Sequence, residues 1–97
     1  MYGTIAKLRI KPGKLEAFRE WAEREESRGV PGFISVTIYQ LDKDPNTLIM
    51  AVQFEDRTSY HANANDPAQH QSFIRMMDYL EAEPEWNDGE IIAVVTE

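Results

Sequence analysis

The chain has 97 residues and a formal charge of -7, from 17 acidic and 10 basic side chains. One domain over 1–97 fits this length, and 42% hydrophobic residues suffice for a core. Nucleic acid and anionic membranes are disfavoured as partners, because phosphate groups bind to basic surfaces. The absence of cysteine excludes disulfides and thiolate chemistry, and no apolar run approaches the ~18 residues of a membrane span. We therefore expect a cytoplasmic protein.

The first two elements follow from a change in hydrophobic period. Residues 3–10 alternate and predict a strand, with one face formed by Ala6, Leu8 and Ile10. Lys7 and Arg9 lie on the opposite face with Ile5, so that face is not simply dry core. Residues 14–28 change to helical spacing, with an apolar stripe of Leu15, Phe18, Trp21 and Ala22.

A hairpin is predicted next. Residues 33–41 are rich in β-branched side chains and read as a strand. Strict alternation puts Ile34, Val36, Ile38 and Gln40 on one face and Phe33, Ser35, Thr37 and Tyr39 on the other. The turn Pro45-Asn46 then leads into a third strand over 47–54, which is apolar on both faces for most of its length.

The remaining part of the chain predicts a broken helix and a last strand. A short helical piece over 59–64 ends at a break, where Asp66 and Pro67 restart a helix over 67–82. The apolar stripe of this helix is His70, Phe73, Met76, Met77 and Leu80. A turn at 87–89 then precedes a strand over 90–96, with the sequence EIIAVVT.

The order strand, helix, strand, strand, helix, strand predicts an α+β, ferredoxin-like βαββαβ fold. Such a fold has a four-stranded antiparallel sheet with helices on one face. The other face would carry apolar residues beyond what a monomer usually leaves exposed. We therefore expect a homodimer that pairs through its sheet faces.

The chain resembles the antibiotic biosynthesis monooxygenase superfamily and related stress-responsive dimeric α/β-barrel proteins. The likeness covers nearly the whole chain, and its markers are Lys11-Pro12-Gly13, Pro31-Gly32, Tyr39, Asp42 with Pro45, and the run 83–90. It implies a dimeric α/β barrel with a pocket in each subunit between sheet and helices. Some members of this superfamily oxidise polycyclic aromatic compounds without metal or flavin, and others degrade haem.

The chain departs from two patterns of that superfamily. The positions of an Asn, a Trp and a His in haem-degrading relatives match Ala6, Asn63 and Phe73 here. Many other relatives carry a His near the position of Asn63 and a Trp near that of Phe54. Haem degradation is therefore disfavoured, and the acid or base of this helix would have to be another residue.

Three side chains of the second helical region are candidates for catalysis. His70 could remove a proton from an acidic phenol or enol, which would then react directly with oxygen. Asn63 could donate a hydrogen bond to a substrate carbonyl or developing oxyanion, and Tyr60 could orient the substrate. The alternatives are a surface histidine at the helix start and an asparagine that braces the break before Pro67.

The candidate substrate-binding residues are apolar or aromatic, namely Trp21, Tyr39, Phe73 and Met77. Such stripes also occur simply as core. His61 and His70 lie nine residues apart across a proline and lack metal-ligand spacing, so we expect neither metal nor cofactor. The leading hypothesis is a cofactor-independent monooxygenase-like dimer acting on a small aromatic or enolisable metabolite. The alternatives are a non-catalytic small-molecule-binding dimer and a haem-binding relative.

Overall fold

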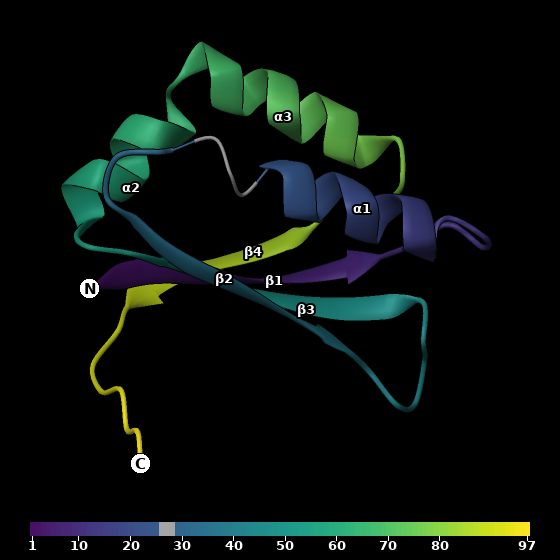
Figure 1. Ribbon diagram of the computed structural model, residues 1–97, viewed down its shortest axis with the longest axis horizontal. Helices are drawn as coiled ribbons and strands as arrows, with labels where there is room; N and C mark the ends of the chain where they lie inside the picture. The colour runs from purple at the N-terminus through teal and green to yellow at the C-terminus, as the bar shows by residue number, and fades with distance from the viewer. Residues whose placement is uncertain (26–28) are drawn as a thin grey trace.

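Residues 1–25 and 29–97 are described by the computed structural model of the chain. Its elements are β1 (Tyr2–Arg9), α1 (Leu15–Glu25), β2 (Phe33–Gln40), β3 (Thr47–Phe54), α2 (Arg57–Ala64), α3 (Pro67–Met77) and β4 (Glu85–Glu90). The strands form one antiparallel sheet in the order β2-β3-β1-β4. All three helices lie on one face of this sheet (Figure 1). The predicted ferredoxin-like α+β fold is therefore confirmed.

The hydrophobic core lies between the sheet and the helices. On β1 the predicted inner residues Ala6 and Leu8 are fully buried, as is Ile10 just after the strand. They pack with Phe18 of α1 and Met76 of α3. Burial of these apolar side chains is the main stabilising contribution to the fold. None of the described helices is both long enough and apolar enough to cross a membrane.

Aspartates cap both halves of the broken helix. Asp56 accepts a hydrogen bond from the backbone N–H of Ser59 at 2.7 Å, and Asp66 accepts one from Ala68 at 2.8 Å. These bonds satisfy backbone donors that the first turn of a helix leaves unpaired. The bond from Ser59 also lowers the pKa of Asp56. The predicted break before Pro67 is confirmed, although α2 begins at Arg57, two residues earlier than expected.

The last strand was predicted wrongly. It spans Glu85–Glu90 instead of 90–96, so the expected turn at 87–89 lies inside the strand. The physical reason is the register with β1, which pairs Tyr2 with Glu90 and Lys7 with Glu85. One further backbone hydrogen bond continues this pairing, from the N–H of Ile91 to the carbonyl of Met1. The residues after Glu90 have strong local β-propensity, but they pair with no strand among the described residues.

The second long helix is also shorter than predicted. It ends at Met77 rather than at residue 82, and the chain then pairs with the end of β1. The carbonyl of Tyr79 accepts a hydrogen bond from Lys11, and the N–H of Glu81 donates to Arg9. Buried Leu80 lies in a bridge opposite Ile10. The first helix was predicted over 14–28, and 26–28 lie outside the described residues.

A bulge in β2 changes which side chains face the helices. The register with β3 shifts between Phe33 and Ser35. Phe33 therefore faces the helices with Val36 and Ile38, while Ile34 is 44% exposed. The predicted face containing Ile34 was wrong at this position, because a bulge inserts one residue and breaks strict alternation.

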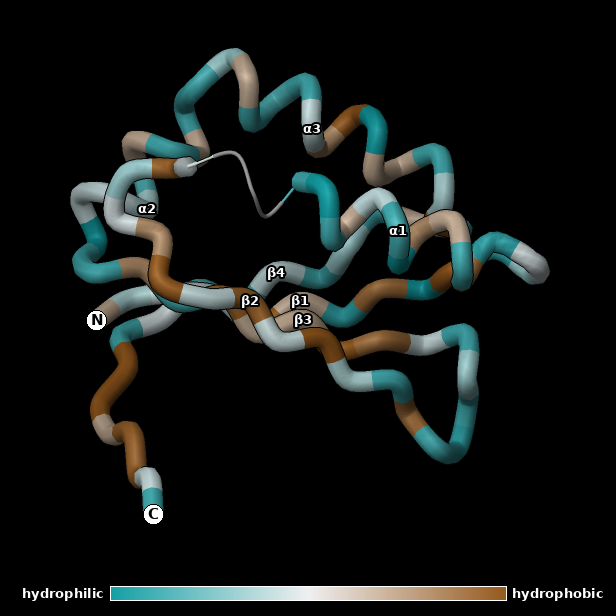
Figure 2. The backbone as a smooth tube through the Cα atoms, in the orientation of Figure 1, coloured by the Kyte–Doolittle hydropathy of each residue, from teal (hydrophilic) through white to brown (hydrophobic). Residues whose placement is uncertain are grey.

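The second face of the sheet carries no helix (Figure 1). Its side chains include Ile5 on β1 and Tyr39 on β2, which are 53% and 59% exposed. The chain after β4 extends away on this side of the sheet, and it is strongly apolar (Figure 2). Within this tail Ile92 is 93% exposed and Val95 is 92% exposed.

Candidate functional site

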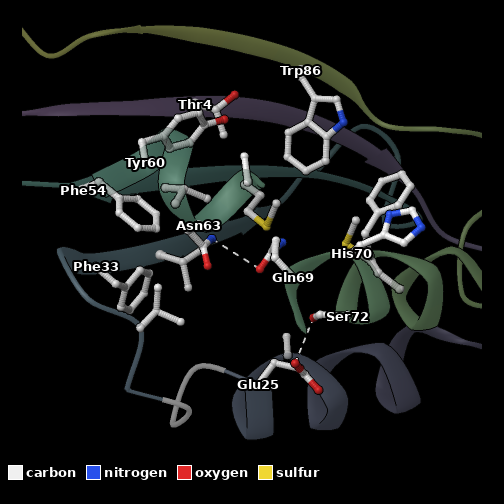
Figure 3. Close-up of a pocket in the computed structure, with 18 of the residues that line it drawn as sticks. Thr4, Glu25, Phe33, Phe54, Tyr60, Asn63, Gln69, His70, Ser72 and Trp86 are labelled. Atoms are coloured by element: carbon white, nitrogen blue, oxygen red, sulfur yellow. Dashed lines mark hydrogen bonds between the residues drawn. The ribbon is translucent and has the colours of Figure 1, made fainter. Parts of the chain in front are cut away.

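A cavity of about 480 Å³ lies between the sheet and the three helices. Its volume is within the range of small-molecule pockets in proteins. The floor is formed by apolar side chains of the edge strand β2 and its neighbour β3, namely Val36, Ile38, Met50, Val52 and Phe54. No Lys or Arg side chain is among the described residues that line it. The pocket is therefore mainly apolar, with a few polar groups at defined places (Figure 3).

One polar group of the pocket joins α2 to strands β1 and β4. The hydroxyl of Tyr60 donates a hydrogen bond to Oδ1 of Asp88 at 2.8 Å. Thr4 on β1 also lines the cavity. Thr4 and Asp88 are directly paired across β1 and β4, so their side chains share the face that lines the pocket.

Burial and the neighbouring carboxylate keep Tyr60 protonated. Desolvation is the largest cause, followed by the hydrogen bond to Asp88 and the charge of Asp88, and together they raise the pKa of Tyr60 to about 12. The nearby Thr4 hydroxyl acts in the opposite direction and lowers the pKa of Tyr60. At neutral pH Tyr60 is therefore a neutral phenol whose proton points to Asp88.

The second polar group is an amide pair. Nδ2 of Asn63 on α2 donates to Oε1 of Gln69 on α3 at 3.3 Å, across the break between the two helices. Both side chains line the cavity. In Figure 3 this pair lies between Tyr60 and His70. One amide hydrogen and the carbonyl oxygen of Asn63 are left over by this bond, so Asn63 can offer a donor and an acceptor to a ligand.

The two histidines both line the cavity but differ in their contacts. His70 is exposed, on the first turns of α3, and its side chain has no hydrogen-bonding partner among the described residues. His61 on α2 accepts a hydrogen bond from Nε of Arg57 at 3.3 Å, and its ring packs at a tilt against Tyr2 and edge-on against Tyr60. His70 is therefore the histidine that remains available to a ligand.

A third polar group braces α1 against α3 at the cavity wall. The buried hydroxyl of Ser72 donates to Oε2 of Glu25 at 2.8 Å. Nη2 of Arg75 lies 3.2 Å from the other carboxylate oxygen of Glu25. Because both oxygens of Glu25 are engaged and its charge is compensated, this group holds the two helices together rather than presenting a free carboxylate.

The predicted substrate-binding residues fall into two sets. Trp21 and Phe73 line the cavity, as do the three predicted catalytic residues Tyr60, Asn63 and His70. Tyr39 and Met77 do not. Tyr39 points to the open face of the sheet, because it alternates with the inward-facing Ile38, and Met77 packs against the core beside the cavity.

Sequence reasoning missed several lining residues, chiefly Thr4, Gln69, Trp86 and Asp88. Two of them, Trp86 and Asp88, lie on β4, where the sequence predicted a turn at 87–89 and no strand before residue 90. Alternation over 85–90 puts these two on one face, but six largely polar residues carry no strand signal of their own. Only the pairing with β1 reveals them.

No metal-binding cluster is present in the described part of the chain: no three side chains of His, Asp or Glu come together there. The indole Nε1 of Trp21 is buried without a hydrogen-bonding partner in that part, next to Phe18 and Tyr79. The chemistry of the site is thus that of hydroxyl, carboxylate, amide and imidazole groups around an apolar cavity.

The fold and the cavity define a class of small ferredoxin-like proteins with a pocket between sheet and helices. The sequence profile described as antibiotic biosynthesis monooxygenase matches residues 1–75, and the chain belongs to this family. No curated protein matches the chain.

Two solved structures illustrate the likeness of the fold. One is a conserved protein from Methanosarcina mazei Go1, with 24% identity and a TM-score of 0.77, which covers 91% of this chain and 89% of its own. The other is a mutant of SnoaB, a cofactor-independent oxygenase from Streptomyces nogalater, with 12% identity and a TM-score of 0.83. That match covers 99% of this chain and 97% of SnoaB.

Proposed function

We propose that this protein is a cofactor-independent oxygenase that acts on a small aromatic or enolisable molecule. The observation that carries the proposal is the apolar cavity, whose few polar side chains include a histidine available to a ligand and an amide pair. Membership of the antibiotic biosynthesis monooxygenase family supports it, as does the fold shared with SnoaB. In this proposal Trp21 and Phe73 contact the faces of an aromatic ring.

His70, Asn63 and Tyr60 have separate roles in the proposed reaction. His70 removes a proton from an activated methylene, for example that of an anthrone, and leaves a delocalised carbanion. Asn63 stabilises the negative charge at the substrate oxygen through its free amide hydrogen. The carbanion reduces molecular oxygen. One oxygen atom becomes the new carbonyl and the other leaves as water together with the two methylene hydrogens. Tyr60, held in place by its hydrogen bond to Asp88, orients the substrate.

Oxygen uptake with anthrone as the substrate tests this function. We expect the protein to accelerate uptake above the rate in buffer, and His70→Ala to lower that acceleration by about a hundredfold. His61→Ala is the matched control, since His61 also lines the cavity but is bonded to Arg57. If anthrone, its hydroxylated analogues and simple quinols all react no faster than in buffer, the proposed activity is wrong.

The second candidate function is the binding of a small molecule without turnover. The specific observation in its favour is that no described side chain orients the imidazole of His70, whereas a catalytic base usually has a partner on its second nitrogen. Tight binding of a hydroxylated aromatic compound without oxygen uptake would identify this case.

We further propose that two copies pair through the open faces of their sheets. Exposed Ile5, Ile34 and Tyr39 support this arrangement, and so does the apolar tail with Ile92 and Val95. Burying such side chains is favourable by about 25 cal/mol per Å². Analytical ultracentrifugation should give a dimer at micromolar concentration, and Ile5→Glu should shift it to monomer. A monomeric wild-type protein would contradict the proposal. The cytoplasmic location expected from the composition stays a prediction.

A further inference from the structure

The hydrogen bonds around Tyr60 have a fixed direction. The backbone N–H of Asn87 donates to Oγ1 of Thr4 at 3.2 Å, and a backbone N–H can only donate. Beside Thr4, the proton of the Tyr60 hydroxyl goes to Oδ1 of Asp88, because a carboxylate oxygen can only accept.

This direction determines what the wall of the cavity offers to a ligand. The only proton of Tyr60 is committed to Asp88. Oδ2 of Asp88 has no hydrogen-bonding or ion-pair partner among the residues that the structure describes. The Tyr60–Asp88 pair therefore accepts hydrogen bonds and donates none, so a ligand group that binds to it has to bring its own proton.

The charge of the cavity agrees with this assignment. Of the two acidic side chains that line it, Glu25 is compensated by Arg75, whereas Asp88 has no cationic neighbour in the described part of the chain. The cavity is lined by no described Lys or Arg. A carboxylate or phosphate group bound beside Asp88 would be repelled by its charge, although solvent screens part of this repulsion because Asp88 is exposed.

The opposite chemistry is found at Asn63 on α2. Asn63 retains an amide hydrogen after its bond to Gln69, and this donor suits a carbonyl oxygen. The cavity is thus lined by an acceptor, Asp88, and a donor, Asn63, among mostly aromatic and apolar side chains.

We infer that Asp88 is a substrate-binding residue that accepts the proton of a substrate hydroxyl group, and that the pocket selects neutral hydroxylated aromatic molecules over carboxylated ones. This inference rests on the proposed function, because it takes the cavity to be the substrate site. It adds the class of substrate and the residue that distinguishes it.

Binding of three probes of nearly equal size tests the inference: 1-naphthol, 1-methoxynaphthalene and 1-naphthoate. Isothermal titration calorimetry on the full chain under nitrogen measures binding without any oxidation. We expect 1-naphthol to bind at least tenfold more tightly than the methyl ether, because a hydrogen bond to a charged group typically contributes about 10- to 100-fold. 1-Naphthoate should bind most weakly of the three.

The variant Asp88→Asn keeps the size of the side chain and removes the charge. It should bring the affinities for 1-naphthol and its methyl ether to within about threefold of each other, since most of the charged hydrogen bond is lost. It should also improve binding of 1-naphthoate. Asp78→Asn is the matched control, because Asp78 is exposed at the end of α3 and outside the cavity, and it changes the net charge equally.

The inference is overturned if 1-naphthoate binds the wild-type protein as tightly as 1-naphthol, if the hydroxyl gives no preference, or if none of the probes binds. It is also overturned if Asp88→Asn leaves the preferences unchanged. The wild-type comparison decides the matter even if that variant does not fold. Because oxygen uptake is not measured, a protein with the expected preferences and no oxidation would refute the oxygenase function alone.

Discussion

Tyr60 should ionise well above the ordinary range of a tyrosine as the pH is raised. Its pKa is raised to about 12, first by burial and then by the hydrogen bond and charge of Asp88. In the unfolded chain the same phenol ionises near its ordinary value of 10.0. Between these two values the unfolded state has lost a proton that the folded state keeps. Stability is therefore fully present below pH 10 and falls as the pH rises toward 12.

The size of this effect follows from the shift. Two pKa units correspond to about 2.7 kcal/mol. The ring of Tyr60 is only half-buried, so solvent screening reduces the contribution to stability to on the order of 1 kcal/mol. Tyr60→Phe should remove this loss of stability between pH 10 and 12, and it also removes the hydrogen bond to Asp88.

Ultraviolet absorbance of tyrosinate measures the ionisation directly, with circular dichroism to confirm that the chain is still folded. The wild-type protein should show a transition near pH 12 that Tyr60→Phe removes. Asp88→Asn should lower the pKa of that transition, because it removes the charge, while the part due to burial stays. If Tyr60→Phe removes no transition near pH 12 from the folded protein, the assigned effect of burial and of Asp88 on Tyr60 is wrong.

Three further predictions concern stability. Phe18→Ala should lower the free energy of unfolding, measured in urea, by about 3–5 kcal/mol, because the Phe18 side chain is only 1% exposed. A loss of stability below about 1 kcal/mol would contradict the central position of Phe18 in the core. Gly32→Ala should lower the free energy of unfolding by about 1–3 kcal/mol more than Gly13→Ala does. Both glycines have φ near +80°, but only at Gly32 would an added Cβ overlap the Ser59 side chain. Equal losses of stability in the two variants would show that Gly32 does not pack closely against α2. Hydrogen bonds from Thr47 and Asn46 lower the pKa of Asp44, so this carboxylate stabilises the protein above pH 3.8 and the contribution is lost as the pH falls below that value. Asp44→Asn should flatten the acid limb of a stability profile measured by urea unfolding, and an unchanged limb would refute this assignment.

The sequence by itself determined the order of the elements. Alternation on β1 separated buried Ala6 and Leu8 from exposed Ile5, and the pair Asp66-Pro67 located the start of α3. These signals are local, because side-chain direction follows the backbone period and a cap needs only its own first turn. The second helical region was accordingly recognised as one wall of the pocket, with Tyr60, Asn63 and His70 on it.

Only the tertiary structure decided which residues near the C-terminus form the fourth strand of the sheet. Residues 90–96 have the stronger β-propensity, yet 85–90 form the strand. The reason is that a strand needs a neighbouring strand for its hydrogen bonds, and β1, which begins at Tyr2 opposite Glu90, pairs with 85–90. This register brings Asp88 and Trp86 to the pocket, while the bulge in β2 turns Phe33 inward and leaves Tyr39 outside it. Register and bulges depend on residues far apart in the chain, so no local pattern contains them.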